Sequence, residues 1–118
     1  MELLDASLDA HPLELVADKV AAAGAITTVE AAGRIGQRVT VAGVRQSAHR
    51  SRTAKGDLMM FLTLEDLEGM LDVILFPDVY RQGRQALNAT APLLVTGVME
   101  MDTNRSEPLL RAEKIKLL

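Results

Sequence analysis

Residues 58–76, LMMFLTLEDLEGMLDVILF, decide how the rest of the chain is interpreted. On each side of the central DLEG, the apolar residues recur with a period of two, which is typical of a half-buried β-strand. DLEG itself contains glycine and carboxylates and is typical of a turn. The stretch therefore predicts a hairpin of two strands, Leu58–Glu65 and Met70–Phe76.

Alternation outside this hairpin predicts three more strands. They cover Arg38–Arg45, Leu93–Met101 and Leu109–Leu117. Gly43 and Gly97 lie inside two of them, where a strand can bend sharply around the corner of a barrel. In the last strand the apolar period slips by one residue at Glu113 and Lys114, which predicts a β-bulge.

Helices are predicted in two places. Pro77–Leu87 begins with proline and brings Tyr80, Gly83 and Leu87 to one face. Near the N-terminus, Leu13–Ala23 and Thr27–Ala32 are two short helices, the first followed by Gly24 as a C-cap. The chain is thus expected to divide into a short helical lead-in segment, residues 1–36, and a β domain, residues 37–118.

Three strands, a helix and two more strands are the order of an OB-fold barrel, an all-β fold. We expect five antiparallel strands closed as a barrel, with the helix between strands 3 and 4 covering one end. A β-sandwich would need more strands. A doubly wound sheet would need helices to alternate with strands throughout.

The composition fits a globular protein of one domain. The chain has 118 residues, 48% hydrophobic and 25% charged, and no cysteine. No apolar run is long enough for a membrane helix, and the N-terminus lacks the basic region of a signal peptide. These features predict a cytoplasmic protein that does not bind a membrane.

Charge is distributed unevenly along the chain. The net charge is −3, yet residues 31–56 hold six basic residues and no acid, between two acidic segments. A local positive field of this kind attracts a phosphate backbone, although a solvated basic loop without a partner is the alternative.

The residues expected to bind nucleic acid lie on and beside the outer face of strand 2. Met60, Leu62 and Leu64 are assigned to the core, which leaves Phe61 and Thr63 facing outward, where an aromatic ring can stack on a base. The segment 46–57 is expected to be a long, flexible loop that contacts phosphates. The full set of candidate residues is Arg45, Arg50, Arg52, Lys55, Phe61, Thr63 and Arg105.

Other chemistry has little support in the sequence. His11 and His49 have no partner at ligand spacing, so no metal site is expected. The acid pair Glu65 and Asp66 falls at a turn and is expected to be solvated rather than catalytic. No phosphate-binding loop or activated nucleophile is recognisable, so we expect no cofactor and no enzymatic activity of the chain itself.

Four stretches carry a resemblance to a known family. Lys55–Gly69, Val73–Tyr80, the upstream Leu8–Glu14 and the closing Arg111–Ile115 resemble the OB domain of the bacterial DNA polymerase III alpha subunit and the segment before it. The resemblance implies a module that contacts single-stranded template DNA, while the catalytic carboxylates of such a polymerase lie in other domains. Phe61 also matches a base-stacking position in the similar anticodon-binding barrels of class II tRNA synthetases.

Two functions remain open. The first is a module that binds single-stranded DNA in replication. The alternative is a protein-interaction module that docks onto replication proteins through its acidic N-terminal helix or through an apolar outer surface formed by Met59, Met70 and Ile74.

Overall fold

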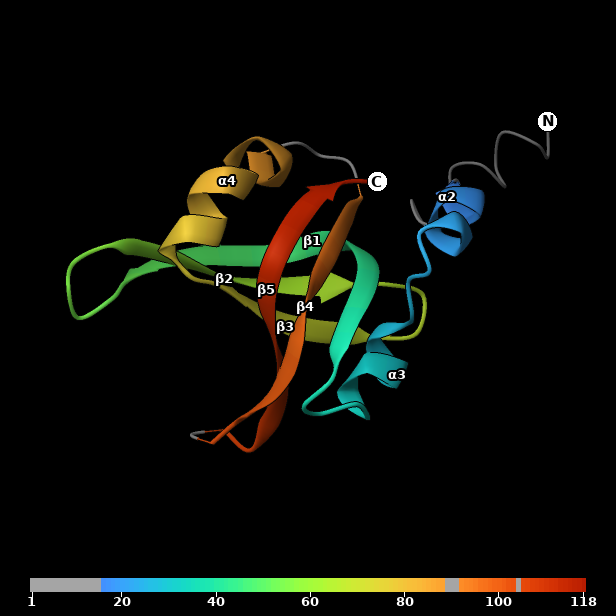
Figure 1. Ribbon diagram of the computed structural model, residues 1–118, viewed down its shortest axis with the longest axis horizontal. Helices are drawn as coiled ribbons and strands as arrows, with labels where there is room; N and C mark the ends of the chain where they lie inside the picture. The colour runs from blue at the N-terminus through green and yellow to red at the C-terminus, as the bar shows by residue number, and fades with distance from the viewer. Residues whose placement is uncertain (1–15, 89–91, 104) are drawn as a thin grey trace.

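The computed structural model describes residues 16–88, 92–103 and 105–118, and its five strands form a closed barrel (Figure 1). The strands are β1 Arg38–Arg52, β2 Leu58–Glu65, β3 Met70–Leu75, β4 Leu93–Asp102 and β5 Glu107–Leu117. The helices are α2 Ala17–Ala22, α3 Thr28–Ala32 and α4 Pro77–Asn88, the last between β3 and β4. The expected OB-fold barrel with its helix is confirmed. No helix in the described part of the chain is long and apolar enough to span a membrane.

One strand pairing corrects the expectation of an entirely antiparallel barrel. Around the ring the order is β1-β2-β3-β5-β4, and β3 pairs with β5 in parallel, with Val73 opposite Leu110. The other four pairings are antiparallel. Strand directions can alternate around a closed ring only if the number of strands is even, so five strands leave one parallel pair.

Strand β1 is much longer than expected, so the predicted loop at residues 46–57 is wrong. After a bulge between Arg45 and Ser47, β1 continues to Arg52 and pairs with β2 along the way. The connection is a short turn in which the Thr53 amide donates to the Asp57 carbonyl, 2.8 Å away, and Gly56 has φ +89°. This hairpin projects beyond the barrel (Figure 1), so both of its faces can be polar and the alternation that marks a strand is missing.

The side chains buried inside the barrel are those that the period-two alternation assigns to the core. Met60, Leu62 and Leu64 of β2 are buried in one core cluster with Leu71, Val73 and Leu75 of β3 and Val39 and Val41 of β1. Burying a side chain of this size fully contributes about 1.5–3 kcal/mol. Tyr80, Gly83 and Leu87 are the buried residues of α4, as predicted. A Cβ on Gly83 would lie 2.1 Å from Ile115 Cγ2, so glycine permits α4 to lie directly on β5.

Strands β4 and β5 approach closely at a second glycine. A Cβ on Gly97 would lie 2.1 Å from the carbonyl oxygen of Arg111. The register shifts beside it, with Thr96 opposite Lys114 and Gly97 opposite Ala112. Glu113 is therefore the extra residue, and the predicted bulge is confirmed.

The segment before the barrel is attached through a buried carboxylate. Asp66 accepts hydrogen bonds from the Thr28 amide (2.7 Å) and hydroxyl (2.8 Å) and from the amides of Glu68 and Gly69 (3.0 Å each). It is 9% exposed, so the expectation that it is solvated is wrong. Thr27 caps α3, because its Oγ1 accepts from the Glu30 amide.

Two further predictions concern the ends of the segments. Gly24 has φ +70° after α2, which agrees with its predicted capping role. The predicted start of that helix at Leu13 lies outside the described residues. The division between a lead-in at 1–36 and a barrel at 37–118 stays a prediction.

Gly97→Ala should destabilise the barrel by about 1–3 kcal/mol, because the added methyl group cannot fit against backbone. Gly69→Ala is the matched control, since its Cβ would have no neighbour closer than the Thr28 hydroxyl at 3.5 Å. Urea denaturation of both variants measures the difference. Equal midpoints for the two variants would contradict the packing described for Gly97.

Glu113→Gln should remove a contribution to stability that depends on pH. Arg38 donates to both carboxylate oxygens of Glu113, at 2.8 and 3.1 Å, and this hydrogen bonding lowers the pKa of Glu113. A lowered folded-state pKa stabilises the protein above the unfolded pKa of about 4.3, and the effect is lost as the pH falls through the folded value. In thermal unfolding at pH 7, the parent should have a higher melting temperature than the variant. The difference should disappear in acid, and a difference independent of pH would contradict this role.

Candidate functional site

Two stacked rings lie on the outer face of the barrel. Phe61 of β2 is half-buried on this face, as the alternation predicts, and His49 of β1 is directly opposite it in the register. The ring centroids are 5.3 Å apart and the planes differ by 18°. Neither ring belongs to the core clusters. The sequence pattern does not identify His49 as part of the site, because it predicts a loop and not a strand at residue 49.

A hollow of about 150 Å³ extends from these rings to the β4–β5 turn. Its polar and charged lining residues are Ser47, His49, Thr63, Asp72, Asp102 and Arg105. The Thr63 hydroxyl donates to Asp72 Oδ1, 3.2 Å away. The structure thus brings together Phe61, Thr63 and Arg105 from the predicted set, and adds Ser47, His49 and two carboxylates.

Arg105 is surrounded by carboxylates. Its guanidinium lies 2.6 Å from Asp72, 3.1 Å from Glu107 and 3.9 Å from Asp102. The hydrogen bond with Glu107 and then the charge of Asp72 raise the pKa of Arg105. Three carboxylates around one guanidinium leave this end of the hollow negatively charged.

The remaining predicted basic residues do not face this hollow. Strand alternation places His49 and Ser51 outward and turns Arg50 and Arg52 to the opposite face of the hairpin. Arg45 donates to the carbonyl of Leu87 at the end of α4. At the tip, Arg52 donates to the Gly56 carbonyl at 2.7 Å, while Lys55 is exposed in the turn.

The apolar outer surface proposed for protein contacts is smaller than expected. Met59 and Ile74 are each only 8% exposed, so they do not form a free surface. Met70 is 61% exposed and stands at the start of β3. An outward position on a strand therefore does not imply exposure at Met59 and Ile74.

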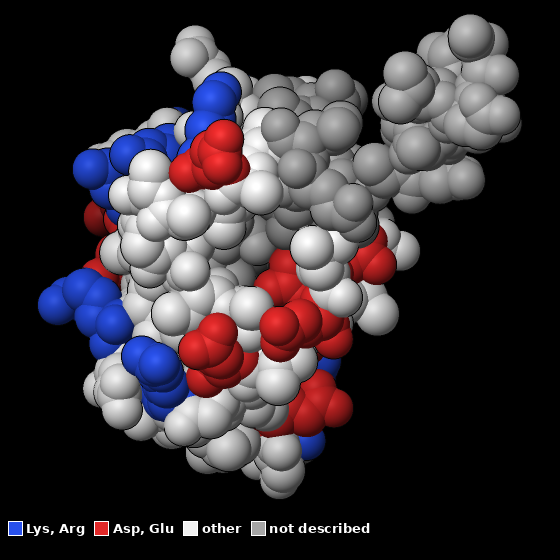
Figure 2. Space-filling view, turned by 90° about the vertical axis from the view of Figure 1, so that its right-hand side faces the viewer, with Lys and Arg blue, Asp and Glu red and all other residues white. Residues whose placement is uncertain are grey.

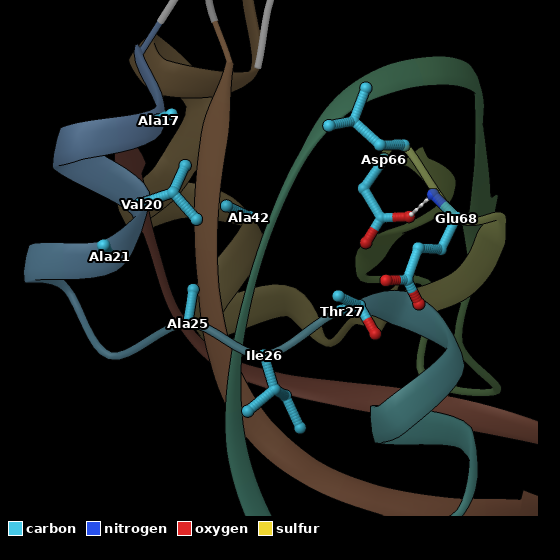
Figure 3. A pocket seen from close by; sticks show the side chains of 10 residues that line it. Ala17, Val20, Ala21, Ala25, Ile26, Thr27, Ala42, Asp66 and Glu68 are labelled. Atoms are coloured by element: carbon cyan, nitrogen blue, oxygen red, sulfur yellow. Dashed lines mark hydrogen bonds between the residues drawn. The ribbon is translucent and has the colours of Figure 1, made fainter. Parts of the chain in front are cut away.

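A second hollow, of about 330 Å³, separates α2 from the β2–β3 turn (Figure 3). Val20 of α2 and Ala42 of β1 line one side, and Asp66 and Glu68 the other. Most of its lining is small and apolar, and none of the predicted nucleic-acid contacts lies in it.

Charge separates the sides of the molecule. Figure 2 faces α2, α3 and the β2–β3 turn, and it shows carboxylates grouped across this side with basic side chains along one edge. Glu30 of α3 and Glu68 of the turn are exposed. This side repels phosphates, whereas the β1–β2 hairpin carries Arg50, Arg52 and Lys55.

Comparison with known proteins identifies sequence relatives among bacterial polymerases. The chain is 35% identical over 82 residues to an error-prone DNA polymerase of Symbiobacterium thermophilum, covering 69% of this chain and 8% of that protein. It is 27% identical over 107 residues to the DNA polymerase III subunit alpha of Bacillus subtilis, covering 90% of this chain and 10% of that protein. The chain thus spans about a tenth of the length of these homologues. No family model matches.

Solved structures with low sequence identity share the fold. Asparaginyl-tRNA synthetase from Pyrococcus horikoshii superposes with a TM-score of 0.62 at 18% identity, over 80% of this chain and 22% of that one. A mitochondrial single-stranded DNA binding protein from S. cerevisiae gives a TM-score of 0.55 at 10% identity, over 70% and 94%. These similarities establish the OB architecture.

Proposed function

Because the chain is homologous to one segment of bacterial DNA polymerase III alpha subunits and error-prone DNA polymerases, we propose that it is a module that binds single-stranded DNA beside a replicative polymerase. The module itself is non-catalytic in this proposal. In this proposal the module holds single-stranded template DNA, and the polymerase beside it carries out nucleotide transfer.

The observation that carries the proposal is the stacked pair of His49 and Phe61 on the outer face. Neither ring is needed by the core clusters, and a half-buried Phe on an outer face is available to a further ring. Stacking of a base on an aromatic side chain contributes about 1–3 kcal/mol and tolerates any sequence. His49 supports Phe61 from the adjacent strand, so the platform is already ordered before a base arrives.

The charges suggest how a strand would lie on this platform. Asp72, Asp102 and Glu107 surround Arg105 at one end, while Arg52 and Lys55 lie at the tip of the hairpin at the other. Phosphates would therefore follow the hairpin toward its tip, with bases turned toward Phe61. Thr63 and Ser47 line the same hollow and can offer hydroxyl groups to a base or sugar.

A protein-interaction module is the second candidate, and the apolar hollow beside α2 favours it. That hollow lies on the acidic side of the molecule (Figure 2), and α2 is at the opposite end of the barrel from the β1–β2 hairpin (Figure 1). The two functions respond differently to salt, because phosphate binding weakens steeply with ionic strength and apolar docking does so only slightly.

Single-stranded DNA should bind more tightly than a duplex of the same length. A hollow with one stacked platform admits an unpaired base, whereas bases held in a duplex cannot stack on a ring that lines it. We expect a dissociation constant on the order of micromolar at physiological salt, since few phosphates are contacted. Fluorescence anisotropy with labelled single and double strands measures this. Tighter binding of the duplex would overturn the proposed mode.

Phe61→Ala should weaken binding of single-stranded DNA by about 1–3 kcal/mol and leave the salt dependence nearly unchanged, because stacking releases no counterions. Leu67→Ala, which truncates a 59%-exposed side chain in the β2–β3 turn, is the matched control and should bind like the parent. Thermal unfolding of both variants shows whether the barrel persists. If Phe61→Ala unfolds the barrel, Phe61 supports the fold rather than a ligand.

The double variant Arg52→Ala, Lys55→Ala should act through charge instead. Removal of each phosphate interaction should flatten the slope of log K against log salt by about 0.7 for a single strand. Arg105→Ala should change the slope less, because carboxylates already neutralise that guanidinium. An unchanged slope in the double variant, with a flattened slope in Arg105→Ala, would reverse the orientation of the strand proposed here.

A further inference from the structure

A larger hollow lies on the opposite face of the β1–β2 hairpin, where the hairpin meets α4. Its volume is about 510 Å³, and its lining residues are Arg45, Ala48, Arg50, Met60, Tyr80, Arg84 and Asn88. In Figure 1 the hairpin extends between α4 on one side and the β4–β5 turn on the other. This hollow, which we call the hairpin–helix groove, is therefore separated by the thickness of the hairpin from the one that contains Phe61.

Three arginines from two elements, β1 and α4, line the hairpin–helix groove. Arg45 and Arg50 come from β1 and Arg84 from α4, and no carboxylate is among the described residues that line it. Arg45 is fixed by its hydrogen bond to the Leu87 carbonyl. In the part of the chain that the structure describes, Arg50 and Arg84 have no ion-pair partner, so their charges remain available.

The rest of the lining identifies the kind of group that fits. Tyr80 is 9% exposed and belongs to the core cluster, so it offers no free ring to a base. Asn88 adds an amide, which can donate to an anionic oxygen. Guanidinium groups bind phosphate with paired N–H donors, so this lining suits phosphates and not bases.

We propose that the hairpin–helix groove binds the sugar–phosphate backbone of a further stretch of single-stranded nucleic acid. The proposal rests on the proposed function and extends it, because the outer face would stack bases while the groove holds phosphates. The two sites lie on opposite faces of one hairpin, whose tip carries Arg52, Lys55 and Asp57 and so keeps a net charge of +1. A strand that leaves the outer face can pass this basic tip and enter the groove.

An oligomer without bases tests the groove separately from the platform. The probe is a labelled abasic deoxyribose-phosphate oligomer of about ten units, titrated against the parent, Arg50→Ala/Arg84→Ala and Phe61→Ala. The matched control is Arg38→Ala/Arg81→Ala, which removes two charges outside the groove that are paired with Glu113 and Asp78. Thermal unfolding confirms that each variant is folded at the temperature of the titration.

The abasic oligomer should bind the parent, Phe61→Ala and the Arg38/Arg81 control with similar affinity. In Arg50→Ala/Arg84→Ala the salt slope should fall by about 1.4, so that the affinity advantage of the parent shrinks about sevenfold between 50 and 200 mM salt. Binding of a normal oligonucleotide should be weakened both by this variant and by Phe61→Ala.

The opposite results separate the two proposals. If Arg50→Ala/Arg84→Ala binds the abasic oligomer like the parent, or like the Arg38/Arg81 control, the groove is not a phosphate site. The platform proposal is then tested by Phe61→Ala alone. If the parent fails to bind the abasic oligomer, the groove proposal is also overturned. If Phe61→Ala binds the normal oligonucleotide as tightly as the parent while Arg50→Ala/Arg84→Ala binds it more weakly, the platform proposal is overturned and the groove proposal stands.

Discussion

The barrel closes because strand β1 changes partner at Gly43. From Arg38 to Gly43 this strand pairs with β4, and from Val44 to Arg52 it pairs with β2. A Cβ on Gly43 would lie 2.6 Å from Leu64 Cγ and 2.7 Å from the Glu65 carbonyl oxygen. Because Gly43 has no side chain, β1 can pass close to Leu64 and Glu65 of β2 at the point where it leaves β4. The same strand can therefore pair with both β4 and β2. The parallel β3–β5 pair then completes the closure with an odd number of strands.

The length of β1 has a consequence for function. The half that pairs with β2 continues past the barrel, and a projecting two-stranded ribbon has two faces that a ligand can reach. Alternation along the ribbon divides the basic segment of the chain, because neighbouring residues point to opposite faces. His49 thereby joins Phe61, while Arg50 joins Arg84 on the helix side. One hairpin thus separates an aromatic platform from a basic groove, which a flexible loop could not do.

In the described part of the chain, only some of the arginines are neutralised by a neighbouring carboxylate. Arg38, Arg105 and Arg111 each lie within 3 Å of a carboxylate, and those contacts tie strands or turns together. Arg50 and Arg84 line the groove without such contacts among the described residues. A chain with a net charge of −3 can therefore still present a locally positive surface, because many of the described carboxylates are paired with particular arginines or lie on the α2 and α3 side. The net charge alone does not reveal this distribution.

The sequence by itself determined the features that depend on local periodicity. A period of two assigns Leu62 to the core and Phe61 to the outside, and the slip at Glu113 marks a bulge, because each follows from a few consecutive residues. Only the tertiary structure decided which of the candidate residues share a surface. Residues 46–52 lack an apolar face, and their strand exists because β2 completes its backbone hydrogen bonds. That pairing sets the register, which places His49 opposite Phe61 and turns Arg50 into the hollow that Arg84 also lines. Likewise, Arg105 contacts Asp72, 33 residues away in sequence, because β3 and β5 pair in the barrel.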